Sequence, residues 1–553
     1  MSTPTSLSYV AYSSPLPPNS VVWGKQGESK ALKQAQQTAW AAAFRSQLQE
    51  FDYEITDIEG TLPDGLKGST LFRNGPSRFE RGAQRVAHYL DGDGYLAKIA
   101  FAPNGKVYFT SRFISTAEHQ KEAHANAFCF RTTFGNNKSG APLTTWLDLY
   151  LKNPANTHIL PWGNKLLALY EAGMPYRIEP TTLDTLGIED LGGNLQSRSL
   201  PFDGPALWLA AIYWRSQGQQ ASTAHPHVDP ERDRLVMWHW GMDISPGQPN
   251  ALTIQLSEYN SDWQTVSSTH YKMPGAAVNP HDFALTPNYY IFFENALSFD
   301  VFPYLMGQKS PAECLKLLPK PTKVHLIPRP DGDMAKAKPL VMETEQWFSI
   351  HQACASEKTD GSVEIYSSGW PATTGGFLTS WGGYAPDFDA IAPTFLWQTT
   401  IHPTAKTITH QIALGTQNNC IAHPHTHPDY ETLPSRYLYM AYCNNIGQSS
   451  PPVGYLRLDT HRQTQQLWTT HPQSFVEEPV IVPHPQGKKE DDGWLLGLIY
   501  DHLQKRSSLA IFDLANLAGG PICRLWFTHH LAHGLHGSWI SKYYGPTASP
   551  LSL

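Results

Sequence analysis

Short β-rich segments separated by turn residues recur from about residue 60 to the end of the chain. The segments favour β-branched and aromatic residues, and Gly, Pro, Asn and Asp stand between them, as in strands joined by turns. Fifteen segments predict strands, at residues 106–113, 165–171, 235–241, 252–259, 289–294, 324–327, 363–367, 395–401, 410–414, 437–442, 454–458, 465–469, 494–500, 509–512 and 524–527. This number is too large for one sandwich and favours a β-propeller, in which loops from many blades converge on an axis. No repeat of fixed period is visible, so the pattern alone does not predict the number of blades.

A segment with the residue pattern of a helix precedes these strands. Residues on one helix face recur at every fourth position, at Leu32, Gln36, Trp40, Phe44 and Leu48, and Ser29 can cap the start. The period predicts a helix over residues 29–51, either packed on the main domain or with Trp40 and Phe44 entering a membrane surface. No Gly/Ser linker divides the chain. We therefore expect an N-terminal extension (1–55), one all-β domain (56–545) and a C-terminal tail (546–553).

Composition and charge exclude several classes of protein. The 553 residues have a formal net charge of −7 and a pI near 6.4, so no basic surface argues for nucleic acid. The six cysteines are scattered without a CxxC pair, which argues against a zinc ribbon or disulfide scaffold and fits a reducing compartment. Residues 1–20 lack the basic and apolar regions of a signal peptide. These features predict a cytoplasmic protein.

The longest apolar run covers residues 205–214. It is shorter than the ~20 residues that a spanning helix needs, so the protein is expected to be soluble or to lie on a membrane surface. Within this run, residues 207–214 have two open interpretations, an exposed apolar patch and a buried strand.

Four histidines stand in similar settings, each at a predicted strand edge beside an acid or a glycine. They are His225, His281, His351 and His536. Because 56, 70 and 185 residues separate them, only a fold that returns repeatedly to one axis brings them together. Neutral imidazole binds iron, copper, zinc and nickel, so the four predict a metal on that axis without selecting the ion. Each histidine alone has an alternative interpretation as a turn residue that caps backbone groups.

Two acidic residues in apolar settings are candidate partners of these histidines. A metal-binding histidine needs its second ring nitrogen fixed by a carboxylate or a carbonyl. Glu171 ends an apolar segment, and Glu478 precedes Pro479 and Val480. A buried glutamate is costly unless it is paired, which suggests a partner for each. Exposure at a strand end is the alternative for Glu171.

Several motifs resemble those of the carotenoid cleavage oxygenases, a family with apocarotenoid, stilbene and retinoid-processing members. The motifs are TLPDGLKG at 61–68, FRNGP at 72–76, HYLDGDG at 88–94 and EDDGW at 490–494, together with the contexts of the four histidines. The resemblance covers about residues 60–539. It implies a seven-bladed propeller, with a few helices and loops capping one face, and one Fe(II) per chain on its axis.

The resemblance also implies roles for individual residues. Fe(II) would be held by His225, His281, His351 and His536, with His227 as the competing assignment for His225. Glu171 and Glu478 would orient ligand histidines. Thr157 would be the small residue whose methyl group hinders one open iron position.

Two departures mark a divergent member of the family. Ala422 stands where the family has a third glutamate, so His351 is expected to be oriented by a carbonyl, a water or another side chain. The run His423, His425 and His427 is nearby and could supply such a side chain, but a solvated loop is the favoured interpretation. After the third ligand, Cys354 replaces the family's asparagine, whereas Glu357 is retained.

The implied activity is cleavage of a C=C bond of a carotenoid or apocarotenoid by O2, with aldehyde or ketone products. A retinoid-type isomerohydrolase, a stilbene-cleaving oxygenase and a non-catalytic polyene-binding propeller are the alternatives. Stilbene-cleaving members bind the phenol of their substrate with a tyrosine and a lysine. Residues 122–138 contain Arg131 but no lysine that clearly matches this position, which disfavours a stilbene substrate.

The expected partner is a hydrophobic polyene, delivered at a peripheral membrane surface, without nucleic acid or an obligate protein partner. Phe283, Trp347, Phe348 and Trp539 lie near the ligands in the sequence and are candidates for the wall of a substrate tunnel. Core packing is the alternative for each of them.

Overall fold

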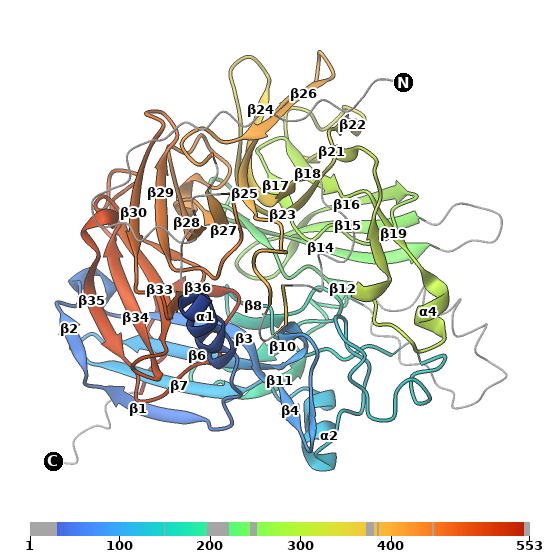
Figure 1. The fold of residues 1–553 in the computed structure, drawn as a ribbon. Coiled ribbons are helices and arrows are strands. Elements are labelled where there is room, and N and C mark those ends of the chain that lie inside the picture. Colours follow the sequence, from blue (N-terminus) through green and yellow to red (C-terminus); the bar gives the residue numbers. More distant parts are fainter. Residues whose placement is uncertain are drawn as a thin grey trace.

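Seven antiparallel sheets stand around one axis as the blades of a seven-bladed β-propeller (Figure 1). The computed structural model describes residues 30–148, 150–195, 221–243, 251–371, 381–383, 386–417, 419–444 and 447–546. The first blade contains β1 (Phe51–Ile55), β7 (Val107–Phe113), β6 (Asp93–Phe101), β3 (Ser69–Arg78) and β36 (Gly537–Ile540). The second contains β8 (His158–Trp162), β9 (Lys165–Leu169), β10 (Tyr176–Ile178) and β11 (Thr185–Ile188).

The next three blades follow in chain order. The third contains β12 (Ala221–Ser222), β13 (His227–Asp229), β14 (Arg234–Asp243), β15 (Ala251–Tyr259) and β16 (Thr265–Pro274). The fourth contains β17 (Phe283–Leu285), β18 (Tyr289–Glu294), β21 (Thr322–Pro328) and β22 (Leu340–Thr344). The fifth contains β23 (Trp347–Glu357), β24 (Val363–Pro371), β25 (Phe395–His402) and β26 (Thr407–Ile412).

The last two blades complete the ring. The sixth contains β27 (Cys420–His425), β28 (Tyr437–Asn444), β29 (Gly454–Asp459) and β30 (Thr464–Thr469). The seventh contains β31 (Ser474–Val476), β32 (Val480–Pro483), β33 (Gly493–Asp501), β34 (Arg506–Asp513), β35 (Pro521–Trp526) and β2 (Ile58–Gly60). Two small hairpins, β4–β5 (Glu80–Arg81, Gln84–Arg85) and β19–β20 (Leu297–Phe299, Leu315–Leu317), lie outside the blades.

Early and late parts of the chain share two blades and so close the ring. β36 pairs with β3, and β2 pairs with β35 (Figure 1). Apolar side chains of the first and seventh blades meet in one buried cluster that includes Leu71, Ile99, Leu509 and Leu525. Full burial of an aliphatic side chain stabilises a fold by about 1.5–3 kcal/mol, so this seam is held by packing as well as by strand pairing.

Helix α1 (Lys30–Ala43) packs on the propeller and ends earlier than the predicted residue 51. Trp40 and Phe44 are buried and meet the rings of Phe475, His533 and Tyr89. The packed interpretation of this helix is therefore correct, and the membrane interpretation is wrong. After Ala43 the chain has no regular structure at residues 45–50, and Phe51–Ile55 then forms β1, which pairs with β7 inside the predicted N-terminal extension.

Each of the fifteen predicted strands overlaps an observed strand. The pattern missed others, including the long β23, because two register shifts interrupt the alternation of its side chains between Ser349 and His351 and between Gln352 and Cys354. It also missed α2 (Ala117–Ala125) and the short α4 (Val301–Leu305). None of the helices in the described ranges has the length and apolar character that crossing a bilayer requires.

A buried ion cluster ties α2 to the first blade. Lys152 Nζ lies 2.7 Å from Glu122 Oε2 and 2.5 Å from Asp93 Oδ1, and Arg81 also pairs with Asp93. All four side chains are almost completely buried. Asp93 belongs to the HYLDGDG motif, so this motif supplies one of the charged residues that join the first blade to α2.

Candidate metal centre

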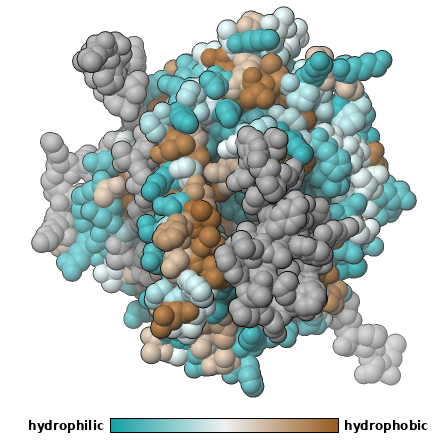
Figure 2. Space-filling model, turned by 90° about the vertical axis from the view of Figure 1, so that its right-hand side faces the viewer, coloured by the Kyte–Doolittle hydropathy of each residue, from teal (hydrophilic) through white to brown (hydrophobic). Residues whose placement is uncertain are grey.

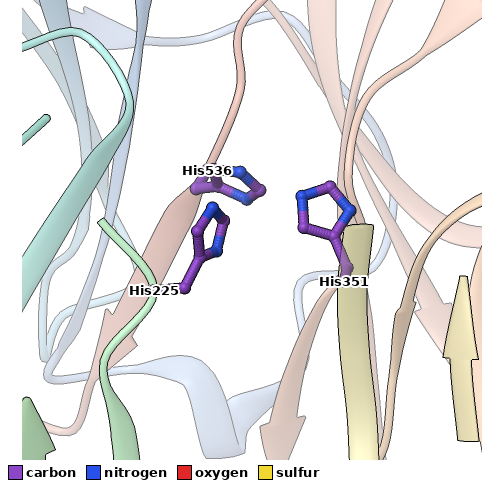
Figure 3. A group of neighbouring side chains, drawn as sticks. All are labelled: His225, His351 and His536. Carbon is purple, nitrogen blue, oxygen red and sulfur yellow. The ribbon is translucent and has the colours of Figure 1, made fainter. Parts of the chain in front are cut away.

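The four predicted histidines lie together at the centre of the propeller. His225 lies between β12 and β13, His281 just before β17, His351 within β23, and His536 directly before β36. The centroid of the His225 ring lies 4.3 Å from that of His281, 5.1 Å from that of His351 and 4.7 Å from that of His536. Figure 3 shows the rings of His225, His351 and His536 facing one another, and each has a ring nitrogen within 4.8 Å of the others.

The geometry of these nitrogens suits a metal ion. His281 Nε2 and His351 Nε2 are 3.3 Å apart, and Nε2 of His225 is buried without a hydrogen-bond partner among the described residues. A buried polar atom without a partner costs stability, and a shared cation would satisfy it. Imidazole nitrogens that converge on one point are the ligands of first-row transition metals.

The electrostatic environment favours the neutral imidazole at two of the four histidines, His225 and His351, and metal binding requires neutral imidazole. Burial, and then the neighbouring histidines, lower the pKa of His225 well below its usual value. Burial together with His423 lowers the pKa of His351 in the same way. Burial also lowers the pKa of His281, but the charge of Glu171 outweighs this effect and the net pKa is raised.

Two of the imidazoles are oriented by carboxylates. Nδ1 of His281 donates to Glu171 Oε2 at 2.7 Å, and Nδ1 of His536 donates to Glu478 Oε1 at 2.7 Å. These bonds leave Nε2 of each ring for the centre. Burial alone would raise the pKa of Glu478, but His536 and His425 outweigh it, so this pKa lies well below its usual value.

The FRNGP motif holds the segment that contains His536. The backbone N–H of Asn74 donates to the carbonyl of His536 at 3.0 Å. A Cβ at Gly75 would lie only 2.5 Å from Cα of Gly534, so a glycine is needed where the two segments cross. Arg73 Nη1 donates to Glu478 Oε2 at 2.8 Å, while its Nε donates to Glu477. Sequence reasoning used this motif only for the resemblance and missed Arg73 as a partner of Glu478.

His158 is a second residue that the sequence reasoning missed. Its Nδ1 lies 3.0 Å from the carbonyl of Ala224, and its Nε2 lies 3.1 Å from Ser538 Oγ. It therefore joins the segments that hold His225 and His536. The neighbouring Thr157 lines the central cavity, and its carbonyl accepts from the backbone N–H of His536 at 3.2 Å.

His227, the competing assignment for His225, has different partners. Its Nε2 lies 2.9 Å from Asp282 Oδ1, and its Nδ1 contacts Glu431. Although burial lowers its pKa, the two carboxylates outweigh this effect and raise the pKa to about 10. A protonated imidazole between two acids is an ion-pair partner and has no free nitrogen for a metal.

The interpretation of His423, His425 and His427 as a solvated loop is wrong for most of this run. Residues 420–425 form β27, and His427 is buried. His423 has a left-handed φ of 48° at a register shift, and its ring centroid lies 4.9 Å from that of His351. Burial and the nearby His536 lower the pKa of His423 well below its usual value. His425 reaches Glu478 Oε1 at 2.9 Å.

A cavity of ≈ 1330 Å³ opens beside the candidate centre. Its wall includes Thr157, Glu171, His281, His351 and His536. Much of the remainder is apolar or aromatic, including Leu297, Phe299, Leu315, Phe348 and Trp370. This volume and lining suit a long apolar ligand.

Only one of the four aromatic residues proposed for the tunnel wall lines this cavity. That residue is Phe348. Phe283 and Trp347 are completely buried in core clusters, and Trp539 packs against the cluster between the first and seventh blades. Core packing is therefore the correct interpretation for these three, because their side chains point between the blades.

Three other residues singled out in the sequence have structural contacts, and one segment is not described. Arg131 is buried and donates to the carbonyls of Tyr304 at 3.1 Å and Lys309 at 2.8 Å. Glu357 accepts two hydrogen bonds from Asn288, and Cys354 is buried in β23. The apolar segment 207–214 lies outside the described residues.

Comparison with known proteins identifies the family. The sequence profile of the family described as retinal pigment epithelial membrane protein matches residues 44–541. The apocarotenoid-15,15'-oxygenase of Synechocystis sp. is 35% identical over 505 residues, which cover 90% of this chain and 96% of that protein. Isoeugenol monooxygenase of Pseudomonas putida is 25% identical over 89% of this chain and 95% of its own length.

Solved structures agree with the sequence comparison. The cobalt-substituted Synechocystis apocarotenoid oxygenase superposes with a TM-score of 0.81 at 34% identity, over 91% of this chain and 98% of that one. The profile match covers most of the chain, and the sequence motifs point the same way. The chain therefore belongs to the family of retinal pigment epithelial membrane protein and the carotenoid cleavage oxygenases.

Proposed function

We propose that this protein is a non-haem Fe(II) dioxygenase that cleaves a C=C bond of an apocarotenoid or carotenoid with O2 and releases two carbonyl products. The observation that carries this proposal is the set of four converging imidazoles beside a large, mostly apolar cavity. Relatives named as apocarotenoid oxygenase, carotenoid cleavage dioxygenase and resveratrol cleavage oxygenase support the reaction class.

The residues at the centre would hold one ferrous ion through His225, His281, His351 and His536. Iron bound in this way would supply a site for O2 activation that the side chains themselves lack. Glu171 and Glu478 would fix the rings of His281 and His536 through their Nδ1 atoms. Thr157, beside His536 in the cavity wall, is proposed to restrict one approach to the metal.

The cavity would hold the polyene and select the double bond that reaches the centre. Its apolar side chains, including Phe299, Phe348 and Trp370, favour an apolar ligand over a charged one. A phenolic stilbene would require a polar contact for its hydroxyl group. Arg131, the candidate for that contact, already donates to backbone carbonyls, which supports a carotenoid-type substrate.

An exposed apolar surface near the cavity supports docking on a membrane, the source of such a substrate. Leu143 and Phe302 are 89% and 66% exposed, and Trp146 and Val301 are also exposed. The backbone N–H of Leu147 donates to the carbonyl of Leu305 at 2.8 Å, which places the two segments side by side. Figure 2 views the face that carries α4, and apolar side chains gather on it.

Val301 and Leu305 of α4 also line the cavity, so this surface lies at its rim. We infer that the rim rests on a lipid surface while a polyene enters. Co-sedimentation with phosphatidylcholine vesicles is expected for the wild type and reduced for the double variant Trp146→Ser/Phe302→Ser. The exposed Leu503, in the turn between β33 and β34, provides the control Leu503→Ser. Equal sedimentation of all three proteins would contradict the docking proposal.

The function is tested by metal content and product analysis. Protein purified without added metal or a His-tag is expected to contain about one iron per chain, which His281→Ala loses while its circular dichroism spectrum stays native. The iron-loaded wild type is expected to consume O2 and release aldehydes from an apocarotenal. Alcohol products from a retinyl ester would instead indicate an isomerohydrolase. A folded wild type that binds no iron after anaerobic addition of Fe(II) would overturn the proposal.

A further inference from the structure

A fifth histidine lies beside the four candidate ligands. The His423 ring centroid is 4.9 Å from that of His351, with 31° between the ring planes, and 5.3 Å from that of His536. A donor atom of His423 lies within 4.8 Å of donor atoms of Glu478 and His536. Its Nδ1 is buried and has no hydrogen-bond partner among the described residues. His423 thus belongs to the centre although no motif marks it.

The backbone of β27 is shaped to aim this ring inward. The pairing of β27 with β28 shifts register between Ala422 and His425, and His423 within this shift has a φ of 48°. Left-handed φ values are costly for residues other than glycine, and such strain persists where surrounding contacts favour it. The bulge turns His423 towards His351, whereas regular alternation would distribute successive side chains to opposite faces.

Two of the four candidate ligand rings are held by a carboxylate, and His423 lies beside one of the two that are not. His281 and His536 each donate to a carboxylate. His351 has no carboxylate within hydrogen-bond distance in the part of the chain that the structure describes. The preceding residue in β27, Ala422, has no polar side-chain atom to offer. The imidazole of His423 lies nearer to the His351 ring, and more nearly parallel to it, than the rings of the other three candidate ligands.

We propose that His423 is a positioning residue of the metal centre, whose ring packs on the His351 imidazole and holds it towards the metal. This inference rests on the proposed function. The His423 ring would provide for His351 the restraint that a carboxylate provides for His281 and His536. It would do so by ring packing, because the planes are only moderately tilted and no hydrogen bond joins the two rings.

The test compares His423→Ala with His423→Phe, using Co(II) as the probe. The phenylalanine variant keeps an aromatic ring and loses both nitrogens, whereas the alanine variant loses the ring. We expect His423→Ala to bind Co(II) at least tenfold more weakly in a chelator competition and to change the visible Co(II) absorption spectrum. We expect His423→Phe to remain within threefold of the wild type and to retain its spectrum. Thermal unfolding of each metal-free variant separates these effects from loss of the fold.

The buried His427 is the matched control in the same run. Its ring packs on Tyr430 rather than on a candidate ligand, so His427→Ala should leave Co(II) affinity and spectrum unchanged. Equal affinity and spectra for the wild type and both His423 variants would overturn the role of His423 alone. Equal impairment of the alanine and phenylalanine variants would overturn the ring-packing mechanism. A wild type that binds no cobalt would overturn the proposed function itself and, with it, this inference.

Discussion

Glu171 Oε2 accepts a 2.7 Å hydrogen bond from Nδ1 of His281. Glu171 follows β9 of the second blade, and His281, 110 positions later, precedes β17 of the fourth blade. The bond fixes which nitrogen of His281 carries the proton, and so leaves Nε2, 3.3 Å from Nε2 of His351, as the atom that would face the proposed metal. Glu171, which is not itself a candidate ligand, therefore determines which ring nitrogen of His281 is free to bind a metal.

Glu171→Gln should weaken metal binding more than it weakens the fold. Loss of a carboxylate behind a ligand histidine reduces metal affinity by about 10- to 100-fold. Because Glu171 is partly exposed, its removal should change the free energy of unfolding of the metal-free protein by less than about 1 kcal/mol. Co(II) titration and urea unfolding measure the two effects. The surface variant Glu54→Gln is the control, and an unchanged affinity in Glu171→Gln would contradict the prediction.

Glu478→Gln should reduce both metal affinity and stability. Glu478 is buried and accepts hydrogen bonds from Arg73, His425 and His536, so the substitution removes a charge that balances a buried guanidinium. Breaking a buried ion pair in this way costs about 3–5 kcal/mol. Because Arg73 keeps its pair with Glu477, we expect a loss near the lower end of this range. Urea unfolding of the metal-free protein measures this loss. A loss no larger than that of Glu171→Gln would show that Glu477 alone balances Arg73.

Lys152→Met should destabilise the fold without acting on the metal centre. It leaves Asp93 and Glu122 buried together, with Arg81 as their remaining cation. The expected loss is about 3–5 kcal/mol in urea unfolding. The surface pair of Lys33 with Asp389 supplies the control, because Lys33→Met should cost less than about 1 kcal/mol. Similar losses in the two variants would show that the buried cluster contributes no more than a surface pair.

The pair of Asp459 with Arg436 predicts an acid-dependent part of the stability. Burial raises the pKa of Asp459, but hydrogen bonds from Arg436 and from backbone N–H groups outweigh it and lower the pKa from 3.8 to about 2. A lowered folded-state pKa stabilises the protein fully above about pH 4, and this contribution disappears as the pH falls towards 2.

Solvent screens this partly exposed pair, so Asp459→Asn should cost about 1 kcal/mol at pH 6 and progressively less between pH 4 and pH 2. Urea unfolding of both proteins across this range measures the difference. A difference that stays constant with pH would show that the carboxylate charge does not contribute.

The strand pattern and the family motifs predicted the blades and the four convergent histidines because both depend on local sequence. Strand segments follow residue type, and the four histidines stand in recognisable motif contexts. The pattern failed at β23 and β27, where bulges break the alternation and aim His351 and His423 at the centre. A bulge depends on the pairing of two strands, which a single segment does not reveal.

The contacts of Arg73 and His158 could not be predicted for a related reason. Arg73 meets Glu478 across 405 positions, and His158 meets Ser538 across 380. Neither pair has a spacing that a sequence motif encodes. The contact of Arg73 forms only when the first and seventh blades meet, and that of His158 forms only when β36 has joined the first blade beside the second. The solvated-loop interpretation of His423 failed in the same way, since Pro-flanked histidines resemble a turn until the partner strand is in place.

Because β36 pairs with β3, binding at the proposed metal site depends on closure of the whole propeller. His536 directly precedes β36, while the other three histidines come from the third, fourth and fifth blades. A ligand that binds only the native state is coupled by mass action to every equilibrium that opens that state. A destabilising substitution in any blade should thus lower the occupancy of the proposed metal site when the metal is scarce, even far from the centre. A variant with a low metal content therefore identifies a ligand only when its propeller is also shown to be fully folded.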